Sequence, residues 1–160
     1  MTSRYPTLGV VTGDTQILDV TLSLDTSAYV TGDLLADAQE IKFAVREGNA
    51  TGMIQSVTLL DKDDKAVDLD LYFTNDSTSW GTENSALAVT DAIADSIYGI
   101  VSIVSTDYTD LVGSQIVFKN NLGMIVKGDS AGSLYVAAAC RGSVTYTASG
   151  ITLRIGILRD

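Results

Sequence analysis

The sequence contains no histidine, and it has one cysteine, one proline and one tryptophan. Without histidine the chain lacks the commonest metal ligand and the side chain that most often carries protons near neutral pH. A single cysteine, Cys140, excludes an intrachain disulfide bond. It follows three alanines, which predicts a buried structural thiol and not a reactive one. These absences exclude much catalytic and metal-centred chemistry, and we expect no enzyme and no cofactor.

Basic residues are also scarce: 10 lysines and arginines stand against 20 aspartates and glutamates, and the net charge is -10. Such a surface repels phosphates, so nucleic acid and anionic membranes are not expected as partners. No apolar run reaches the roughly 18 residues of a membrane span, and the first residues lack the apolar core of a secretory signal. We therefore expect a chain that is synthesised in the cytoplasm.

The strongest positive signal is an alternation of apolar and polar residues with a period of two, which is typical of half-buried β-strands. It is clearest in residues 18–25 and in the second half of Met53–Phe73. The charged run Asp61–Lys65 interrupts the latter stretch and is costly to bury without partners. Met53–Phe73 therefore predicts an antiparallel hairpin with a solvated tip.

Turn residues separate further short apolar segments and complete the predicted fold. Thr90 or Asp91 can cap a short helix near residues 90–98, and Gly99 can end it. Many short strands with one helix predict an all-β fold, an antiparallel β-sandwich or a jelly-roll-like barrel. Residues 1–9, which hold the only proline, predict an N-terminal arm, and 10–160 a single β-sandwich domain. The other predicted strands are 40–46, 100–104, 115–119, 123–126, 133–141, 144–147 and 151–158.

Three patterns suggest chemistry, and each has a structural interpretation. Gly128–Gly132 fits the G-x-S-x-G pattern of serine hydrolases, but the chain has no histidine base, and flanking strands predict a hairpin turn. Asp61, Asp63 and Asp64 suggest calcium, yet the register of a calcium-binding EF-hand loop fails, and at most weak cation binding is expected. Asp68 and Asp70 have a spacing that glycosidase carboxylates also show, although a solvated strand face accounts for them.

The single tryptophan, Trp80, has two interpretations. With Tyr72 or Tyr108 it would form a platform on which a sugar ring stacks. A lone tryptophan among few aromatic residues is more often part of a core or an interface.

The carboxyl-terminal third contains the segments Leu134–Ala138, Arg141-Gly142, 145–150 and Leu153-Arg154, and the earlier chain contains Gln55–Thr58, the turn at Asp61–Asp64, Leu71–Phe73 and Thr82–Ser85. In these segments the chain resembles capsid decoration, or cement, proteins of tailed bacteriophages. The resemblance implies a structural virion protein on the capsid exterior, which binds the major capsid protein, forms a homotrimer and stabilises the head. It implies no diagnostic active site.

Within this hypothesis, the interface residues are expected in the arm and at the tryptophan: Arg4, Tyr5, Pro6, Thr7 and Trp80. Mobile arms commonly order on binding, which makes 1–9 a candidate contact with the shell or a neighbouring subunit. Two alternatives stay open at this point. One is a carbohydrate-binding β-sandwich on a virion surface, and the other is a neck or tail structural subunit.

Overall fold

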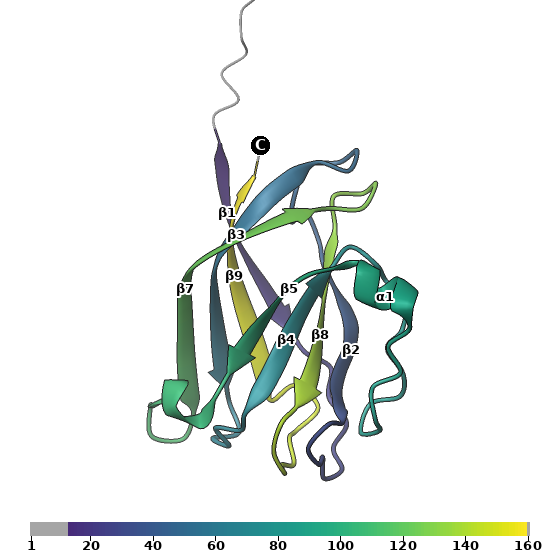
Figure 1. Cartoon of the computed structure of the whole chain (residues 1–160). Coiled ribbons are helices and arrows are strands. Elements are labelled where there is room, and N and C mark those ends of the chain that lie inside the picture. Colours follow the sequence, from purple (N-terminus) through teal and green to yellow (C-terminus); the bar gives the residue numbers. More distant parts are fainter. Residues whose placement is uncertain (1–12, 160) are drawn as a thin grey trace, which may run out of the picture.

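The computed structural model describes residues 13–159 of the chain. In this part the chain forms nine strands, the helix α1 (Asp91–Asp95) and the short 3-10 helix η1 (Ser105–Asp107) (Figure 1). The strands are β1 (Asp14–Thr21), β2 (Leu34–Ile41), β3 (Thr51–Asp61), β4 (Leu69–Thr74), β5 (Ile97–Ile103), β6 (Thr109–Asp110), β7 (Gln115–Lys127), β8 (Leu134–Cys140) and β9 (Ile151–Arg159).

The strands form two antiparallel sheets that pack into a sandwich. One sheet has the order β1-β9-β3-β7-β6, and the other has the order β2-β8-β4-β5. The antiparallel pairs β1–β9, β2–β8, β3–β7 and β4–β5 are nested, as in a long hairpin folded over on itself. This is the winding of a jelly roll. The prediction of an all-β sandwich with one short helix is confirmed, and Thr90 caps α1 as expected.

The hairpin predicted for Met53–Phe73 is wrong. Both halves are strands, but β3 pairs with β7 and β9 in one sheet, whereas β4 pairs with β5 and β8 in the other. The apolar faces of both strands point into the same core. Alternation identifies the buried face of a strand and leaves its hydrogen-bonding neighbour open, which is why the sequence suggested direct pairing.

Other boundaries also differ from the prediction. The strand expected at 40–46 lies earlier, as β2, and Phe43 beyond it is 67% exposed with a φ of 58°. The segment 144–147 forms a single bridge from Val144 to Tyr29 in place of a strand. The strands expected at 115–119 and 123–126 merge into β7, with a register shift opposite Ile54 and Ser56. The loop after β7 crosses to the other sheet and is not a hairpin turn.

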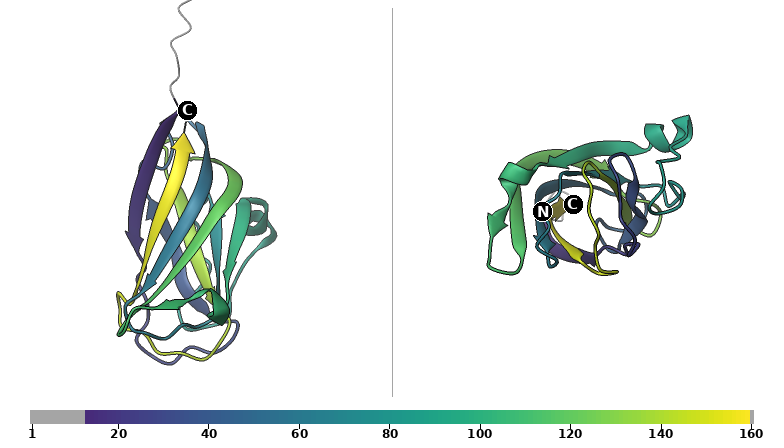
Figure 2. Two further views of the ribbon diagram at one scale, coloured as in Figure 1. Left: turned by 90° about the vertical axis from the view of Figure 1, so that its left-hand side faces the viewer. Right: turned by 90° about the horizontal axis from the view of Figure 1, so that it is seen from below.

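The two sheets differ in what covers their outer faces. On the four-stranded sheet, a second apolar cluster forms from Leu34 and Ala137 of the sheet with Trp80 and Ile93 of the segment between β4 and β5. The helix α1, which carries Ile93, lies beside this sheet in Figure 1. Figure 2 shows β1, β9, β3 and β7 side by side, with η1 and the short β6 at their lower ends. No helix within 13–159 has the length and apolar character needed to cross a membrane.

Candidate interaction surface

Of the predicted interface residues, Trp80 is the one that the structure describes. Its side chain is 0% exposed and its ring lies 5.1 Å from that of Tyr72, centroid to centroid. Asp37 of β2 accepts a hydrogen bond from the Trp80 backbone N–H at 2.7 Å and another from the Ser79 hydroxyl at 2.6 Å. The ring therefore closes the outer face of the four-stranded sheet, and it offers no exposed face for sugar stacking. Arg4, Tyr5, Pro6 and Thr7 lie outside the described residues.

Asp61 organises the loop that follows β3. Its side chain is 0% exposed, and its carboxylate accepts backbone N–H groups of Asp63 at 3.0 Å and of Lys65 and Ala66 at 2.9 Å. The Tyr146 hydroxyl donates to the same carboxylate at 3.4 Å. The expectation of a solvated tip is thus wrong at Asp61, because a tight loop supplies donors that make burial of the carboxylate favourable.

Asp63 joins this loop to the one before β9. Its carboxylate accepts the Thr147 backbone N–H at 2.6 Å and the Thr147 hydroxyl at 2.9 Å. Because these bonds are partly open to water, Asp63→Ala is expected to lower the free energy of unfolding by about 1 kcal/mol. Urea denaturation measures the change. Thr147→Val, which removes the hydroxyl but keeps the backbone N–H, should cost less, and an Asp63→Ala variant as stable as the parent protein would contradict the expectation.

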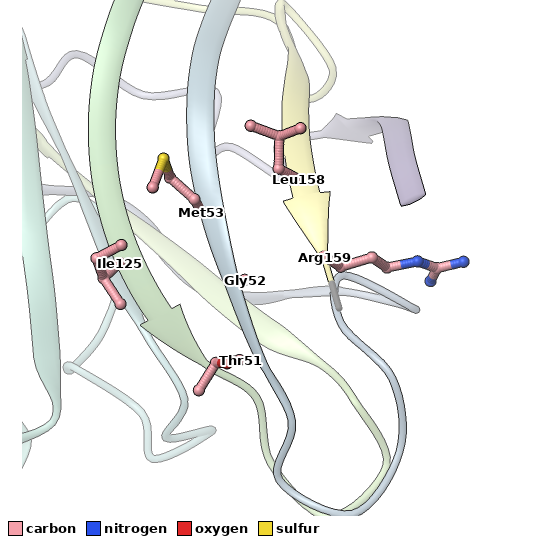
Figure 3. Close-up of a pocket in the computed structure, with 6 residues that line it drawn as sticks. All are labelled: Thr51, Gly52, Met53, Ile125, Leu158 and Arg159. Carbon is pink, nitrogen blue, oxygen red and sulfur yellow. The ribbon is translucent and has the colours of Figure 1, made fainter. Parts of the chain in front are cut away.

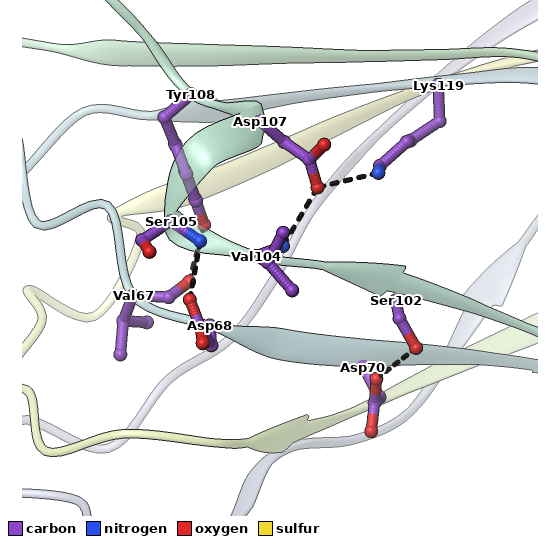
Figure 4. Close-up of polar contacts among 9 residues, drawn as sticks. All are labelled: Val67, Asp68, Asp70, Ser102, Val104, Ser105, Asp107, Tyr108 and Lys119. Carbon is purple, nitrogen blue, oxygen red and sulfur yellow. Dashed lines mark hydrogen bonds and ion pairs between the residues drawn. The ribbon is translucent and has the colours of Figure 1, made fainter.

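Asp68 and Asp70 act within the four-stranded sheet and its edge (Figure 4). Asp68 accepts the backbone N–H of Ser105, and Asp70 accepts the Ser102 hydroxyl at 2.6 Å. Asp70 also pairs with Arg141 at 2.7 Å. These carboxylates hold strands and loops in register. This structural role accounts for the spacing of Asp68 and Asp70, which glycosidase carboxylates also show.

Figure 4 shows a further ion pair near the same edge, between Asp107 of η1 and Lys119 of β7 at 2.6 Å. The ammonium group and a hydrogen bond from the backbone N–H of Val104 lower the pKa of Asp107. Tyr108 donates its hydroxyl to the carbonyl of Val67 at 2.7 Å, and burial raises its pKa. The Tyr108 side chain thus also has a structural role.

The G-x-S-x-G segment is a structural loop. The Asp129 carboxylate accepts the backbone N–H groups of Ala131 and Ser133 at 2.9 Å and the Tyr135 hydroxyl at 3.2 Å. Cys140 is buried, and desolvation raises the pKa of its thiol, which fits the predicted structural role. Among residues 13–159, no three or more acidic or cysteine side chains gather as a metal site would require.

The outer face of the five-stranded sheet carries exposed apolar side chains from several neighbouring strands. We call it the bare face and define it by the outward residues of β1, β9, β3 and β7. One row across the four strands joins Thr15, Leu158, Met53 and Ile125, each opposite the next. Ile17 is 72% exposed, Ile125 61% and Phe118 59%. The full set of outward apolar side chains is Ile17, Met53, Leu60, Ile116, Phe118, Ile125 and Leu158.

Charge is sparse on the bare face although the chain carries a net charge of -10. Asp19 is the acidic residue at an outward position of the four strands, and Arg154 of β9 pairs with it at 2.9 Å. Lys127, at the end of β7, is exposed. A face that combines exposed isoleucines with neutralised charge is typical of a protein–protein contact.

Shallow hollows indent this face, and two of them lie beside its exposed isoleucines. The first lies between Met53, Ile125 and Leu158, which come from three neighbouring strands (Figure 3). The second lies over Gly156 and is bordered by Ile17 and Gln55. Gly156 has no side chain, and a Cβ atom there would clash with the hydroxyl of Ser56, which occupies the adjacent space.

Sequence reasoning did not identify the bare face. Its signal is present in the alternation, because Ile17, Phe118 and Ile125 stand at positions where a solvated strand face would carry polar residues. To recognise them as one surface requires the strand order, since they come from strands far apart in the chain.

No family model matches the sequence, and no curated protein matches it. Among solved structures, the capsid of Ralstonia phage GP4 is 14% identical, with a TM-score of 0.35, and the match covers 91% of this chain and 82% of that chain. A structure of Desmodium yellow mottle tymovirus is 13% identical over 91% and 80%, with a TM-score of 0.29. A Bacteroides thetaiotaomicron protein described as sugar binding is 11% identical over 98% and 85%, with a TM-score of 0.27. The structural similarity to viral capsid proteins is weak and assigns no family.

Proposed function

We propose that this chain is a structural virion protein, a decoration or cement protein that binds the outside of a tailed-phage head and stabilises it. The observation that carries the proposal is the bare face. An acidic chain that leaves exposed isoleucines on a nearly neutral surface has a region suited to contact with another protein. The resemblance of the sequence to phage decoration proteins indicates the kind of particle that the chain binds, a phage head.

The hydrogen bonding of the acidic residues supports a structural role. Asp61, Asp63, Asp70 and Asp129 each bind donors that fix a loop or a strand. Side chains committed to such bonds are not free to bind a substrate or to transfer protons. We therefore propose an architectural subunit and not an enzyme.

In this proposal the chain binds the major capsid protein on the exterior of the virion and assembles there as a homotrimer. A closed oligomer would also protect the open edge of β1, which pairs with β9 on one side of the sheet. The arm at 1–9, with Arg4, Tyr5, Pro6 and Thr7, is the proposed contact with the shell.

Binding to heads tests the function directly. Purified chain is mixed with heads of the phage whose head genes neighbour its own, prepared without this protein, and the mixture is sedimented through a glycerol gradient. We expect the chain to move with the heads and electron cryo-microscopy to place it outside the shell. We also expect decorated heads to release their DNA at a higher temperature than bare heads. A chain that stays at the top of the gradient would rule out the proposal.

Deletion of 1–9 tests the arm separately. The deletion is expected to weaken binding to heads at least about tenfold, the equivalent of roughly 1.4 kcal/mol, because it removes the proposed contact. Circular dichroism and thermal unfolding of the deleted chain provide the control for folding. Equal head binding by the deleted and the full chain would show that the arm is not part of the interface.

A further inference from the structure

We infer that the bare face is a self-association surface, covered by a second copy of the same chain. This deepens the proposed function, because it rests on the chain being an assembly subunit and names the partner of one surface. Three properties of the face support it: its charge, its shape and its contrast with the other sheet.

Charge favours a contact between copies on this face over other parts of the surface. Two copies with a net charge of -10 repel each other, and a contact forms most easily where unpaired acids are absent. On the bare face Asp19 is paired with Arg154, and Lys127 adds a positive charge at one end. A cationic partner would be attracted to the acidic parts of the surface, whereas this neutral, apolar face suits a partner of its own kind.

The shape of the bare face makes it complementary to its own copy. The face carries projecting side chains, of which Ile17 and Ile125 are the most exposed at 72% and 61%. It also carries hollows, one over Gly156 and one beside Met53 and Leu158. A surface that pairs with its own copy must contain both the projections and the hollows that receive them. We place Ile17 or Ile125 of one copy in a hollow of the other.

The four-stranded sheet shows how this chain treats an apolar sheet face. There, the segment with Trp80 and Ile93 covers Leu34 and Ala137, so the apolar side chains leave water within one molecule. On the bare face, by contrast, Ile17, Phe118 and Ile125 stay 72%, 59% and 61% exposed in the described chain. An equivalent cover for the bare face would come from another molecule.

The size of the face sets the strength of the contact. Four strands about 4.8 Å apart, with outward rows spanning about 20 Å, give an area of roughly 400 Å². A standard stable interface buries about 800 Å² on each partner. The area is about half of this, so we expect association that depends on concentration, with a dissociation constant in the range of about 1 to 100 μM. On a particle, the high local concentration of the chain would drive this association to completion.

Sedimentation velocity of the full chain, without heads, tests the inference over about 1 to 200 μM, a range that brackets the expected dissociation constant. We expect a concentration-dependent dimer, because a face that pairs with the same face of its copy closes with two chains. Ile17→Asp and Ile125→Asp should each weaken association at least about tenfold, because they place an unpaired charge in the contact. Ile100→Asp is the matched control: Ile100 is also an exposed strand isoleucine, at 53%, but it lies in β5 of the other sheet, and its replacement should leave association unchanged.

The outcomes separate this inference from the proposed function. A chain that remains monomeric throughout the range, or variants that associate like the parent protein, would overturn self-association through the bare face, even if the chain binds heads. Self-association that Ile17→Asp and Ile125→Asp disrupt would support the inference even if head binding fails. Thermal unfolding of each variant confirms that it is folded, which is expected because the replaced side chains are exposed.

Discussion

Replacing Asp61 by alanine is expected to lower the free energy of unfolding by about 3 to 4 kcal/mol. The carboxylate is 0% exposed and accepts hydrogen bonds from three backbone N–H groups and from the Tyr146 hydroxyl. Alanine removes the acceptor and leaves these donors without a partner, and each buried donor left unpaired costs about 1 kcal/mol or more. The effect should be large because one side chain both ends β3 and directs the chain toward the other sheet.

Urea denaturation followed by circular dichroism measures this change in stability. Lys65→Ala is the matched control, since it alters an exposed side chain in the same loop and keeps the backbone N–H that Asp61 accepts. It should change the free energy of unfolding by less than about 0.5 kcal/mol. Asp61→Asn, which retains one oxygen, should fall between the two. A loss below about 1 kcal/mol for Asp61→Ala would show that the loop does not depend on this carboxylate.

Trp80→Ala is the second large expected effect, a loss of about 3 to 5 kcal/mol. The indole is 0% exposed and packs against Leu34, Ile93 and Ala137 as well as the ring of Tyr72. Alanine would leave a cavity and expose the outer face of the four-stranded sheet to water. The variant is therefore expected to unfold more readily, and at about 37 °C to lose assembly only because less of it is folded.

Trp80→Phe separates packing from hydrogen bonding at the same position. Nε1 of Trp80 is buried and has no hydrogen-bond partner among the described residues. Phenylalanine removes this unpaired donor and keeps much of the ring, so its cost should be only about 1 to 2 kcal/mol. Thermal and urea unfolding of both variants test the pair. A stable Trp80→Ala protein that fails to assemble would contradict this prediction and would indicate that Trp80 belongs to the interface.

The sequence predicted which kinds of site are absent, but it did not predict the candidate surface. The shortage of side chains for catalysis and metal binding follows from composition, since no fold can supply a histidine or a second cysteine. The bare face was not predictable, because Ile17 and Ile125 stand more than a hundred residues apart in the chain. Likewise, an aspartate among charged neighbours looks solvated in sequence, and only the positions of the N–H groups around Asp61 make its burial favourable.

The stretch Met53–Phe73 shows where local and tertiary information divide. Its alternation by itself determined two strands with one apolar face each, because side chains of a strand point alternately to opposite sides. The same local rules determined the all-β class and the short helix capped by Thr90. The tertiary structure alone decided that β3 and β4 lie in different sheets, and that within residues 13–159 Trp80 covers one outer face while the other stays bare. Strand pairing depends on contacts between distant segments, and a local apolar pattern is compatible with many such partners.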